Sequence, residues 1–299
     1  MNASTGSAVM GSVFCLGLFA GLSPQDLNLS ESYLITGETL CETAEKVVYK
    51  KTPQGELLLY ILRPKEGLQG SLPAIVYFTG GGWVGGEPGD QIANAAWFRD
   101  RGMIGITADY RVRSRHGTTP LECVKDAKSA IRYVRGHAKE LGVNPARIVA
   151  AGGSAGGHIA ACTVLTEGCD EPGEDESVSS KADALVLHNP VLGGRGFGAE
   201  FFEEHPECSP IRCVRGGLPP TVLSCGTEDD VTPYGETERF VRLMKEAGNA
   251  CELITIPGAG HSCDWPATNP HFLPTLKRMA AFLEEHGFIP NRGSPVRSD

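Results

Sequence analysis

The 299-residue sequence contains no block of basic residues and no hydrophobic run long enough to cross a bilayer. Its 27 Lys and Arg residues are outnumbered by 36 Asp and Glu residues, and the formal net charge is −9 at pH 7. Non-specific binding to nucleic acid depends on clustered positive charge, so this balance argues against a nucleic-acid partner. The longest uncharged apolar run covers residues 8–22, which is shorter than the roughly 20 residues that a membrane-spanning helix needs.

Residues 8–22 fit either the core of a signal peptide or an apolar segment that lies on the folded domain. No Lys or Arg precedes the run, and no convincing small-x-small cleavage site follows it. These two observations slightly favour a cytoplasmic protein over an exported one. The sequence leaves the oligomeric state open.

Ten cysteines are present, but none forms a C-x-x-C pair, and they are too few for a disulfide scaffold. Cys162 and Cys225 fall in apolar helix and strand patterns, which predicts buried free thiols. Cys208 and Cys213 lie in a loop pattern and are the pair to test for a disulfide if the protein is exported. Because the His and Cys residues show no ligand spacing, we expect no metal ion and no organic cofactor.

Strand and helix patterns alternate along most of the chain, and no internal repeat interrupts them. Residues 46–51 and 56–64 predict an antiparallel pair around the turn TPQG. Short apolar runs, typical of strands buried on both faces, follow at residues 73–80, 102–110, 146–154, 182–190 and 219–227. The clearest helical periodicity covers residues 120–141. This alternation predicts the α/β class, with a mostly parallel central sheet and helices on both faces.

The first glycine-rich turn has the spacing of a dinucleotide-binding loop but lacks its context. Gly80, Gly82 and Gly85 satisfy G-x-G-x-x-G directly after a strand pattern. A dinucleotide turn needs a helix to begin at the third glycine, and here Pro88 and Gly89 oppose one. The sequence also lacks G-K-[ST], which excludes a P-loop. The loop is therefore better suited to some other negative charge.

The second glycine-rich turn, at residues 152–156, carries a candidate nucleophile. Ser154 stands in a G-x-S-x-G motif between a strand pattern and a helix pattern, which is the context that the motif requires. Only small residues fit beside a hydroxyl exposed on so sharp a turn, and residues 152, 153 and 155–157 are all Gly or Ala. The following helix also supplies unpaired N–H groups next to Ser154.

A serine nucleophile needs a base and an orienting carboxylate, which in this kind of fold follow in the order Ser, Asp or Glu, His. A later strand pattern ends in the acidic residues Glu228, Asp229 and Asp230. Of the eight histidines, His261 alone follows a strand pattern on a glycine turn after that acid segment. The residues by themselves leave open which carboxylate serves.

Residues 108–160 resemble the core of the α/β-hydrolase fold esterases related to hormone-sensitive lipase and to small carbohydrate (acetylxylan) esterases. The segments GTED…TPY and GAGH are similar to the acid and histidine loops of that family. The resemblance extends over residues 74–288. It implies Ser154 as the nucleophile, Asp229 as the orienting acid and His261 as the base.

The resemblance also assigns the first glycine-rich turn. TGGG occupies the place of the family's H-G-G-G motif. This correspondence implies that the N–H groups of Gly81 and Gly82, together with that of Ala155, form an oxyanion hole. Thr79 replaces the usual histidine of the motif, so we expect a different hydrogen bond to hold the loop.

Carried along the chain, the resemblance predicts a hydrolase domain at residues 46–290. Residues 1–45 would be an N-terminal segment, either a cap or a targeting remnant, and residues 291–299 a flexible tail. A short cap-like insertion is expected near residues 192–218.

Substrate contacts are expected at the mouth of the site. The insertion contains Phe197, Phe201 and Phe202, and we assign Phe201 and Phe202, with Trp83 and His188, to substrate binding. The alternative is a surface loop whose phenylalanines pack on the core. Neither version has enough apolar material for a lipase tunnel.

These observations predict a serine hydrolase that cleaves short-chain carboxylic esters through an acyl-enzyme. The substrate would be a small-molecule or oligosaccharide ester, with acetylated carbohydrates as candidates. An amidase or exopeptidase with the same triad is the first alternative, because fold and triad do not separate esters from amides. A non-catalytic ligand-binding relative is the second, and the complete set of Ser, Asp and His counts against it.

Overall fold

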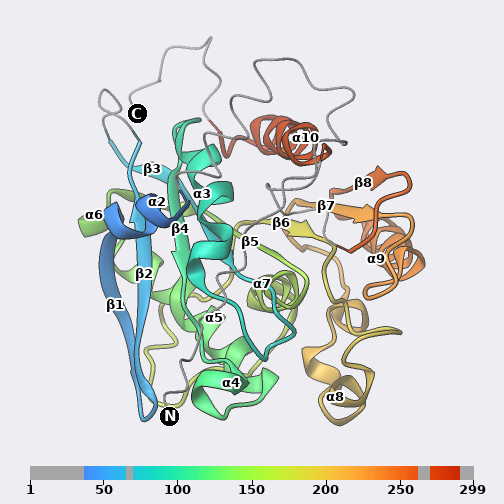
Figure 1. Ribbon diagram of the computed structural model, residues 1–299, viewed down its shortest axis with the longest axis horizontal. Coiled ribbons are helices and arrows are strands. Elements are labelled where there is room, and N and C mark those ends of the chain that lie inside the picture. Colours follow the sequence, from blue (N-terminus) through green and yellow to red (C-terminus); the bar gives the residue numbers. More distant parts are fainter. Residues whose placement is uncertain (1–36, 65–69, 262–269, 290–299) are drawn as a thin grey trace, which may run out of the picture.

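An eight-stranded sheet runs through the computed structural model, which describes residues 37–64, 70–261 and 270–289 (Figure 1). The spatial order of the strands is β1-β2-β4-β3-β5-β6-β7-β8. Strand β2 pairs antiparallel with both of its neighbours, β1 and β4. All the other pairings, from β4 across the sheet to β8, are parallel. The strands are β1 (Glu45–Thr52), β2 (Gly55–Leu62), β3 (Leu72–Phe78), β4 (Ile104–Ala108), β5 (Val143–Gly153), β6 (Ala184–His188), β7 (Thr221–Gly226) and β8 (Cys251–Ile256).

Each strand predicted from an apolar run is present, and so is the antiparallel pair at the start of the domain. Successive side chains of a strand point to opposite faces of the sheet. In β3, Ala74, Val76 and Phe78 belong to one hydrophobic cluster, while Ile75 and Tyr77 belong to another. Both faces of the sheet are therefore covered, which explains why the central strands read as unbroken apolar runs.

Helices cover the two faces. One face carries α2 (Gly37–Thr43), α3 (Ile92–Arg99) and α10 (Phe272–Glu285), and the other carries α5 (Pro120–Gly136), α7 (Ala155–Leu165) and α9 (Tyr234–Glu246). The predicted α/β class, with helices on both faces, is confirmed. The shorter helical pieces are α4 (Arg113–His116), α6 (Ala138–Leu141), α8 (Ala199–Glu204) and the 3₁₀ turns η1 (Pro88–Gln91), η2 (Pro206–Cys208) and η3 (Pro210–Cys213).

The helix expected over residues 120–141 is divided into α5 and α6 at His137. Its start follows the sequence: Thr119 and Glu122 form a reciprocal capping box around Pro120 in the first turn. At the break, His137 leaves helical geometry with φ −103° and ψ 21°. The apolar periodicity continues across the break, so the sequence pattern alone predicts one helix.

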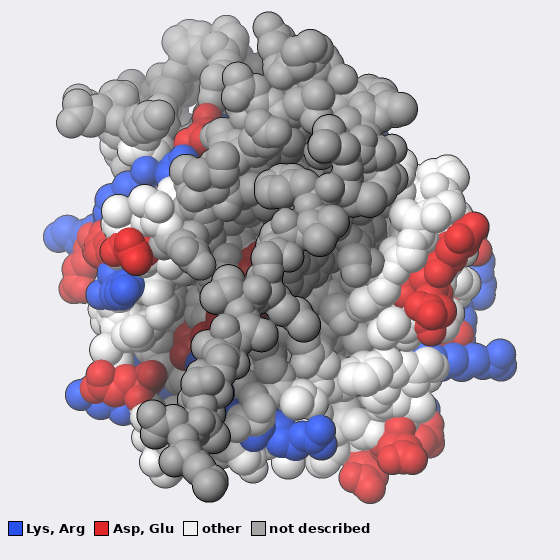
Figure 2. All heavy atoms as spheres, in the orientation of Figure 1, with Lys and Arg blue, Asp and Glu red and all other residues white. Residues whose placement is uncertain are grey.

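Several predicted segments lie wholly or partly outside the described residues. The 291–299 tail is among them, and of the 1–45 segment only residues 37–45 are described, including α2, which packs against α3 and η1. The expected insertion at 192–218 contains α8, η2 and η3. None of the helices in the described ranges has both the length and the hydrophobicity needed to cross a membrane. On the described part of the face in Figure 2, acidic and basic side chains are interspersed around the edge.

A buried ion cluster ties the antiparallel edge of the sheet to the helices. The Asp126 side chain, on α5, is 0% exposed. It accepts hydrogen bonds from Lys50 Nζ on β1 at 2.6 Å and from Arg111 Nε and Nη2, beyond β4, at 2.8 Å each. Glu171 Oε2 binds the same two cations at 2.7 and 2.8 Å. One carboxylate therefore joins three parts of the chain that are distant in sequence.

Removal of Asp126 should be strongly destabilising. Asp126→Ala leaves the two buried cations with Glu171 as the carboxylate they still contact, while Lys50 also keeps the Ser129 hydroxyl. The free energy of unfolding should therefore fall by about 3–5 kcal/mol in chemical denaturation. The matched control is Glu56→Ala, which breaks the exposed Lys51–Glu56 pair and should cost less than about 1 kcal/mol. Equal losses in the two variants would contradict this account.

Candidate active site

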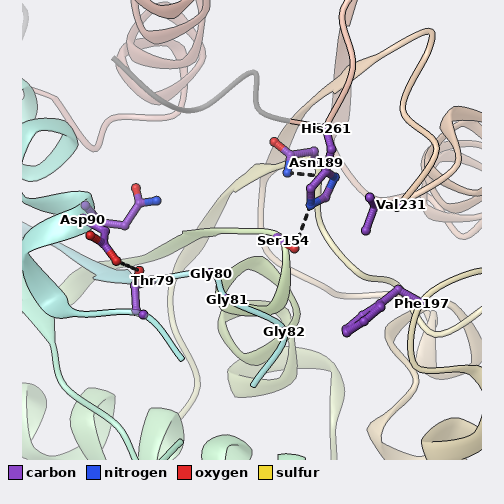
Figure 3. A pocket seen from close by; sticks show the side chains of 12 residues that line it. Thr79, Gly80, Gly81, Gly82, Asp90, Ser154, Asn189, Phe197, Val231 and His261 are labelled. Atoms are coloured by element: carbon purple, nitrogen blue, oxygen red, sulfur yellow. Dashed lines mark hydrogen bonds between the residues drawn. The ribbon is translucent and has the colours of Figure 1, made fainter. Parts of the chain in front are cut away.

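The carboxyl ends of the parallel strands meet at one edge of the sheet, and the residues that follow them form a single site (Figure 3). Thr79 follows β3, Ser154 follows β5, Asn189 follows β6 and His261 lies beyond β8. These four residues line one cavity of about 470 Å³. Open α/β sheets bind their ligands at this edge, so the topology itself selects the position.

Ser154 stands on a strained turn between β5 and α7. Its φ of 53° and ψ of −121° lie outside the regions that side-chain-bearing residues normally occupy. The turn leaves no room for a side chain at Gly152 or Gly156: a Cβ on Gly152 would come within 2.7 Å of the Phe78 carbonyl oxygen, and one on Gly156 would overlap the same atom. The small residues seen in the sequence are therefore required by close backbone approach.

The hydroxyl of Ser154 begins a hydrogen-bonded series of three side chains. Ser154 Oγ lies 2.9 Å from His261 Nε2 (Figure 3). His261 Nδ1 lies 2.9 and 3.0 Å from the carboxylate oxygens of Asp229. A neutral His261 that donates its Nδ1–H to Asp229 presents the lone pair of Nε2 to the serine proton. This arrangement fits a Ser-His-Asp catalytic triad.

Asp229 is held by its own turn. Its carboxylate accepts the N–H groups of Val231 at 3.0 Å and Thr232 at 2.7 Å, and the Thr232 hydroxyl at 2.8 Å. Burial by itself raises the pKa of Asp229, but the hydrogen bonds from His261 and Thr232 outweigh it and hold this pKa below its usual value. Glu228 and Asp230 are exposed, so of the three carboxylates considered, Asp229 is the one that contacts His261.

The first glycine-rich loop lies next to Ser154, since a Cβ on Gly80 would be 3.4 Å from Ser154 Cβ. Gly81 and Gly82 have φ of 106° and 62°, and a Cβ on Gly81 would overlap the carbonyl of Gly85. Within the described ranges, the N–H groups of Gly81 and Gly82 donate no hydrogen bond to a backbone carbonyl. The N–H of Ala155, the first residue of α7, has no partner within its helix. Three N–H groups at the positions predicted for an oxyanion hole are thus free of backbone acceptors.

Thr79 replaces the histidine of the family motif, and a different hydrogen bond holds the loop, as expected. Its hydroxyl lies 3.3 Å from Asp90 Oδ2, which also accepts the N–H of Glu87 at 2.9 Å. The Tyr110 hydroxyl donates to the Thr79 carbonyl at 2.8 Å. Together these bonds attach the loop to η1 and to the end of β4.

The cavity has a polar and an apolar side, with Ser154 between them (Figure 3). Thr79, Asp90 and Gln91 line the polar side, whereas Phe197 and Val231 line the apolar side. Phe197 comes from the 192–218 connection, and its N–H lies 3.5 Å from the Val231 carbonyl. Its ring rests on the glycine loop, since a Cβ on Gly82 would come within 3.0 Å of it.

The substrate contacts predicted at Trp83, His188, Phe201 and Phe202 are not supported by this geometry. None of the four is among the described residues that line the cavity. Trp83 packs against Phe201, Phe202 and the ring of His158, which accepts the indole N–H at 3.2 Å. Trp83 also stacks on Phe197, with ring centroids 5.3 Å apart, so these side chains contact the cavity lining without being part of it.

His188 lies at the end of β6, as predicted, but its ring is buried against Tyr77 instead of reaching the cavity. Burial lowers the pKa of His188 to about 4, so the ring is neutral near pH 7. The residues that the prediction missed are Phe197, Asp90 and Asn189. Asn189 could have been found from the sequence, because it lies at the carboxyl end of the strand predicted at residues 182–190.

Two family models match the chain in neighbouring segments. The BD-FAE model matches residues 59–192, which include the glycine loop and Ser154. The prolyl oligopeptidase family model matches residues 186–287, which include Asp229 and His261.

Solved structures extend the likeness over most of the chain. Thermogutta terrifontis esterase 2 phosphonylated by sarin is 41% identical, with a TM-score of 0.81, and the match covers 84% of this chain and 98% of that one. The chain belongs to the esterases of the α/β-hydrolase fold. The same Thermogutta esterase has been solved with propionate and with butyrate bound, and both structures superpose with a TM-score of 0.78.

The chain also has curated relatives, which are longer than it is and less similar to it in sequence than the Thermogutta esterase. The probable isoprenylcysteine alpha-carbonyl methylesterase ICMEL1 of Arabidopsis thaliana is 28% identical over 246 residues, which are 72% of this chain and 50% of that relative. Carboxylesterase NlhH of Mycobacterium tuberculosis is 38% identical over 221 residues, 64% of this chain and 66% of the relative. The chain therefore spans about half to two thirds of the length of these two relatives.

The carboxylate assignment can be tested with two neighbouring variants of the esterase. Asp229→Asn should lower kcat on p-nitrophenyl acetate by about 10³–10⁴-fold. The amide would favour the wrong tautomer of His261, and it carries no negative charge to stabilise the imidazolium. Asp230→Asn, an exposed neighbour, is the matched control and should retain nearly full activity at a similar melting temperature. A greater loss in Asp230→Asn would show that the register of the acid turn is wrong by one residue.

Proposed function

We propose that this chain hydrolyses short-chain carboxylic esters through an acyl-enzyme on Ser154. The observation that carries the proposal is the series Ser154–His261–Asp229, with contacts of 2.9 Å at each step, opening into a cavity beneath the glycine loop. Ser154 is the nucleophile, His261 the base and Asp229 the orienting acid.

The geometry suggests each chemical step. Ser154 Oγ attacks the ester carbonyl while His261 Nε2 takes its proton, and the buried Asp229 carboxylate stabilises the imidazolium. The carbonyl oxygen becomes an oxyanion that the N–H groups of Gly81, Gly82 and Ala155 would receive, each donor lowering the barrier by about 3 kcal/mol. His261 then gives its proton to the leaving alcohol. Water, activated by the same base, releases the acid from Ser154.

The apolar side of the cavity favours a small acyl group. Phe197 and Val231 stand beside Ser154, and the 192–218 connection supplies no further apolar side chain to the described cavity lining. The similar Thermogutta esterase binds propionate and butyrate, which are acids of this size. These facts support acyl groups from acetyl to butyryl.

The polar side favours a hydrophilic alcohol. Thr79, Asp90 and Gln91 offer hydroxyl, carboxylate and amide groups that can hydrogen-bond the hydroxyls of a sugar. Acetylated sugars or xylo-oligosaccharides are therefore the natural substrates that we propose. Hydrolysis of an amide or peptide bond is the second candidate, and the prolyl oligopeptidase family match over residues 186–287 favours testing it.

The nucleophile is tested by removing its hydroxyl. Ser154→Ala should lower turnover by at least ~10³-fold and abolish covalent labelling by a fluorophosphonate, because only binding and oxyanion effects would remain. Labelling of another serine at the wild-type rate would overturn the assignment of Ser154.

The acyl preference is tested with p-nitrophenyl esters from acetate to decanoate. We expect the highest kcat/KM between acetate and butyrate, and Phe197→Ala should move the optimum to longer chains because it enlarges the apolar side. Phe201→Ala is the control, since Phe201 does not line the cavity. An optimum at octanoate or longer in the unmodified protein would contradict the short-chain proposal.

The alcohol preference is tested in parallel on an acetylated xylan and on aminoacyl amides. Release of acetate from the xylan would support the carbohydrate substrate, and its absence from every glycan tested would remove that part of the proposal. Amide hydrolysis faster than ester hydrolysis would favour the second candidate.

A further inference from the structure

Two cysteines from distant parts of the chain lie in contact. Cys169 Sγ, in the loop after α7, is 3.7 Å from Cys208 Sγ, at the end of η2, and 39 residues separate them in sequence. From the sequence, Cys208 and Cys213 are the pair to test for a disulfide if the protein is exported. In the structure, Cys213 Sγ contacts the carbonyl oxygen of Glu207 at 3.3 Å. Among the described residues, the sulfur that contacts Cys208 Sγ is that of Cys169.

The two thiols are chemically different. Cys169 is partly exposed, and the hydrogen bond from the Cys208 thiol lowers the pKa of Cys169 to about 7. The same hydrogen bond, together with burial, raises the pKa of Cys208. Cys169 therefore carries a substantial thiolate fraction near neutral pH, and the thiolate is the form that attacks a disulfide. Cys208 is a protected thiol within its reach.

We propose that Cys169 and Cys208 form a disulfide when the protein meets a small disulfide such as oxidised glutathione. The Cys169 thiolate attacks one glutathione sulfur, which forms a mixed disulfide and releases one glutathione thiolate. Cys208 then loses its proton and attacks the Cys169 sulfur, which forms the protein disulfide and releases the second glutathione. Two protein thiols are oxidised, and one oxidised glutathione is reduced to two thiols.

The bond would join two elements that shape the active site. Cys169 follows α7, the helix that begins directly after Ser154. Cys208 lies in the 192–218 connection, which also carries Phe197, and its carbonyl already accepts a hydrogen bond from His158 Nε2 at 2.8 Å. His158 in turn holds Trp83 on the glycine loop. A covalent link at this point fixes the 192–218 connection to the helix of the proposed nucleophile.

A metal ion is the alternative occupant of these sulfurs. A carboxylate oxygen of Glu207 and both sulfurs lie within 4.8 Å of one another, and thiolates bind Zn²⁺. Structural zinc sites use four protein ligands, whereas the described residues supply three here. Glu207 also lies 3.2 Å from His205 Nδ1, at the surface. The pair of sulfurs is therefore better suited to a disulfide.

The test uses the full chain, reduced and treated with a chelator, then equilibrated with oxidised and reduced glutathione. Peptide mass spectrometry should find a Cys169–Cys208 crosslink, and the melting temperature should rise by about 5–10 °C, because the crosslink restricts the unfolded chain. Cys213→Ser should behave like the unmodified protein. Cys169→Ser, at the partly exposed position, should fold normally but show neither the crosslink nor the rise.

Three outcomes would overturn the proposal. They are the absence of a crosslink in the unmodified chain, a crosslink from Cys208 to Cys213, and one equivalent of Zn²⁺ in the isolated protein that protects both thiols until chelator is added. None of these measurements uses ester hydrolysis, so the result is independent of the proposed function.

Discussion

The close approach of two backbone turns is the constraint on which the site depends. Gly152 and Gly156 place the turn of Ser154 against the carbonyl of Phe78, where β3 leads into the glycine loop. No side chain larger than hydrogen fits at either position. This contact brings Ser154 next to the glycine loop that follows β3, since a Cβ on Gly80 would lie 3.4 Å from Ser154 Cβ. A methyl group at Gly156 would overlap the Phe78 carbonyl and push the turn of Ser154 away from this loop.

The fold stabilises this strained turn through burial. A residue at φ 53° and ψ −121° costs of order 1–3 kcal/mol, and such a conformation persists only where the surroundings determine it. Here α7, which begins directly after Ser154, is buried along all of its residues. The turn is also fixed by hydrogen bonds, since the N–H of Ser154 donates to the His188 carbonyl and its own carbonyl accepts from Val191. Strain at one residue is thus offset by packing along a whole helix.

Local chemistry explains what could be predicted from the sequence. Buried strands, the glycine turn of Ser154 and the strand-end position of His261 each follow from residues adjacent in the chain, and the structure contains them all. Asp229 needed a family resemblance to be chosen over its neighbours, because three acidic residues share one turn. Of these three residues, Asp229 is the one whose carboxylate accepts hydrogen bonds both from His261 Nδ1 and from the N–H groups of its own turn.

The parts that could not be predicted depend on how separate segments pack. Phe197 and Phe201 are equally apolar and close in sequence. The path of the 192–218 connection decides that Phe197 lines the cavity, whereas Phe201 packs against the ring of Trp83. The contact between Cys169 and Cys208 likewise crosses 39 residues. His188 ends a strand as expected, but the side chain of a residue in that position can point into the core as readily as into the cavity.

A crystal structure of the protein after reaction with a small organophosphonate would test most directly whether the two turns form one catalytic site. The geometry predicts phosphorus bonded to Ser154 Oγ, with its phosphoryl oxygen about 2.7–3.1 Å from the backbone nitrogens of Gly81, Gly82 and Ala155. A phosphoryl oxygen turned towards Asp90, with those three N–H groups unoccupied, would contradict the account.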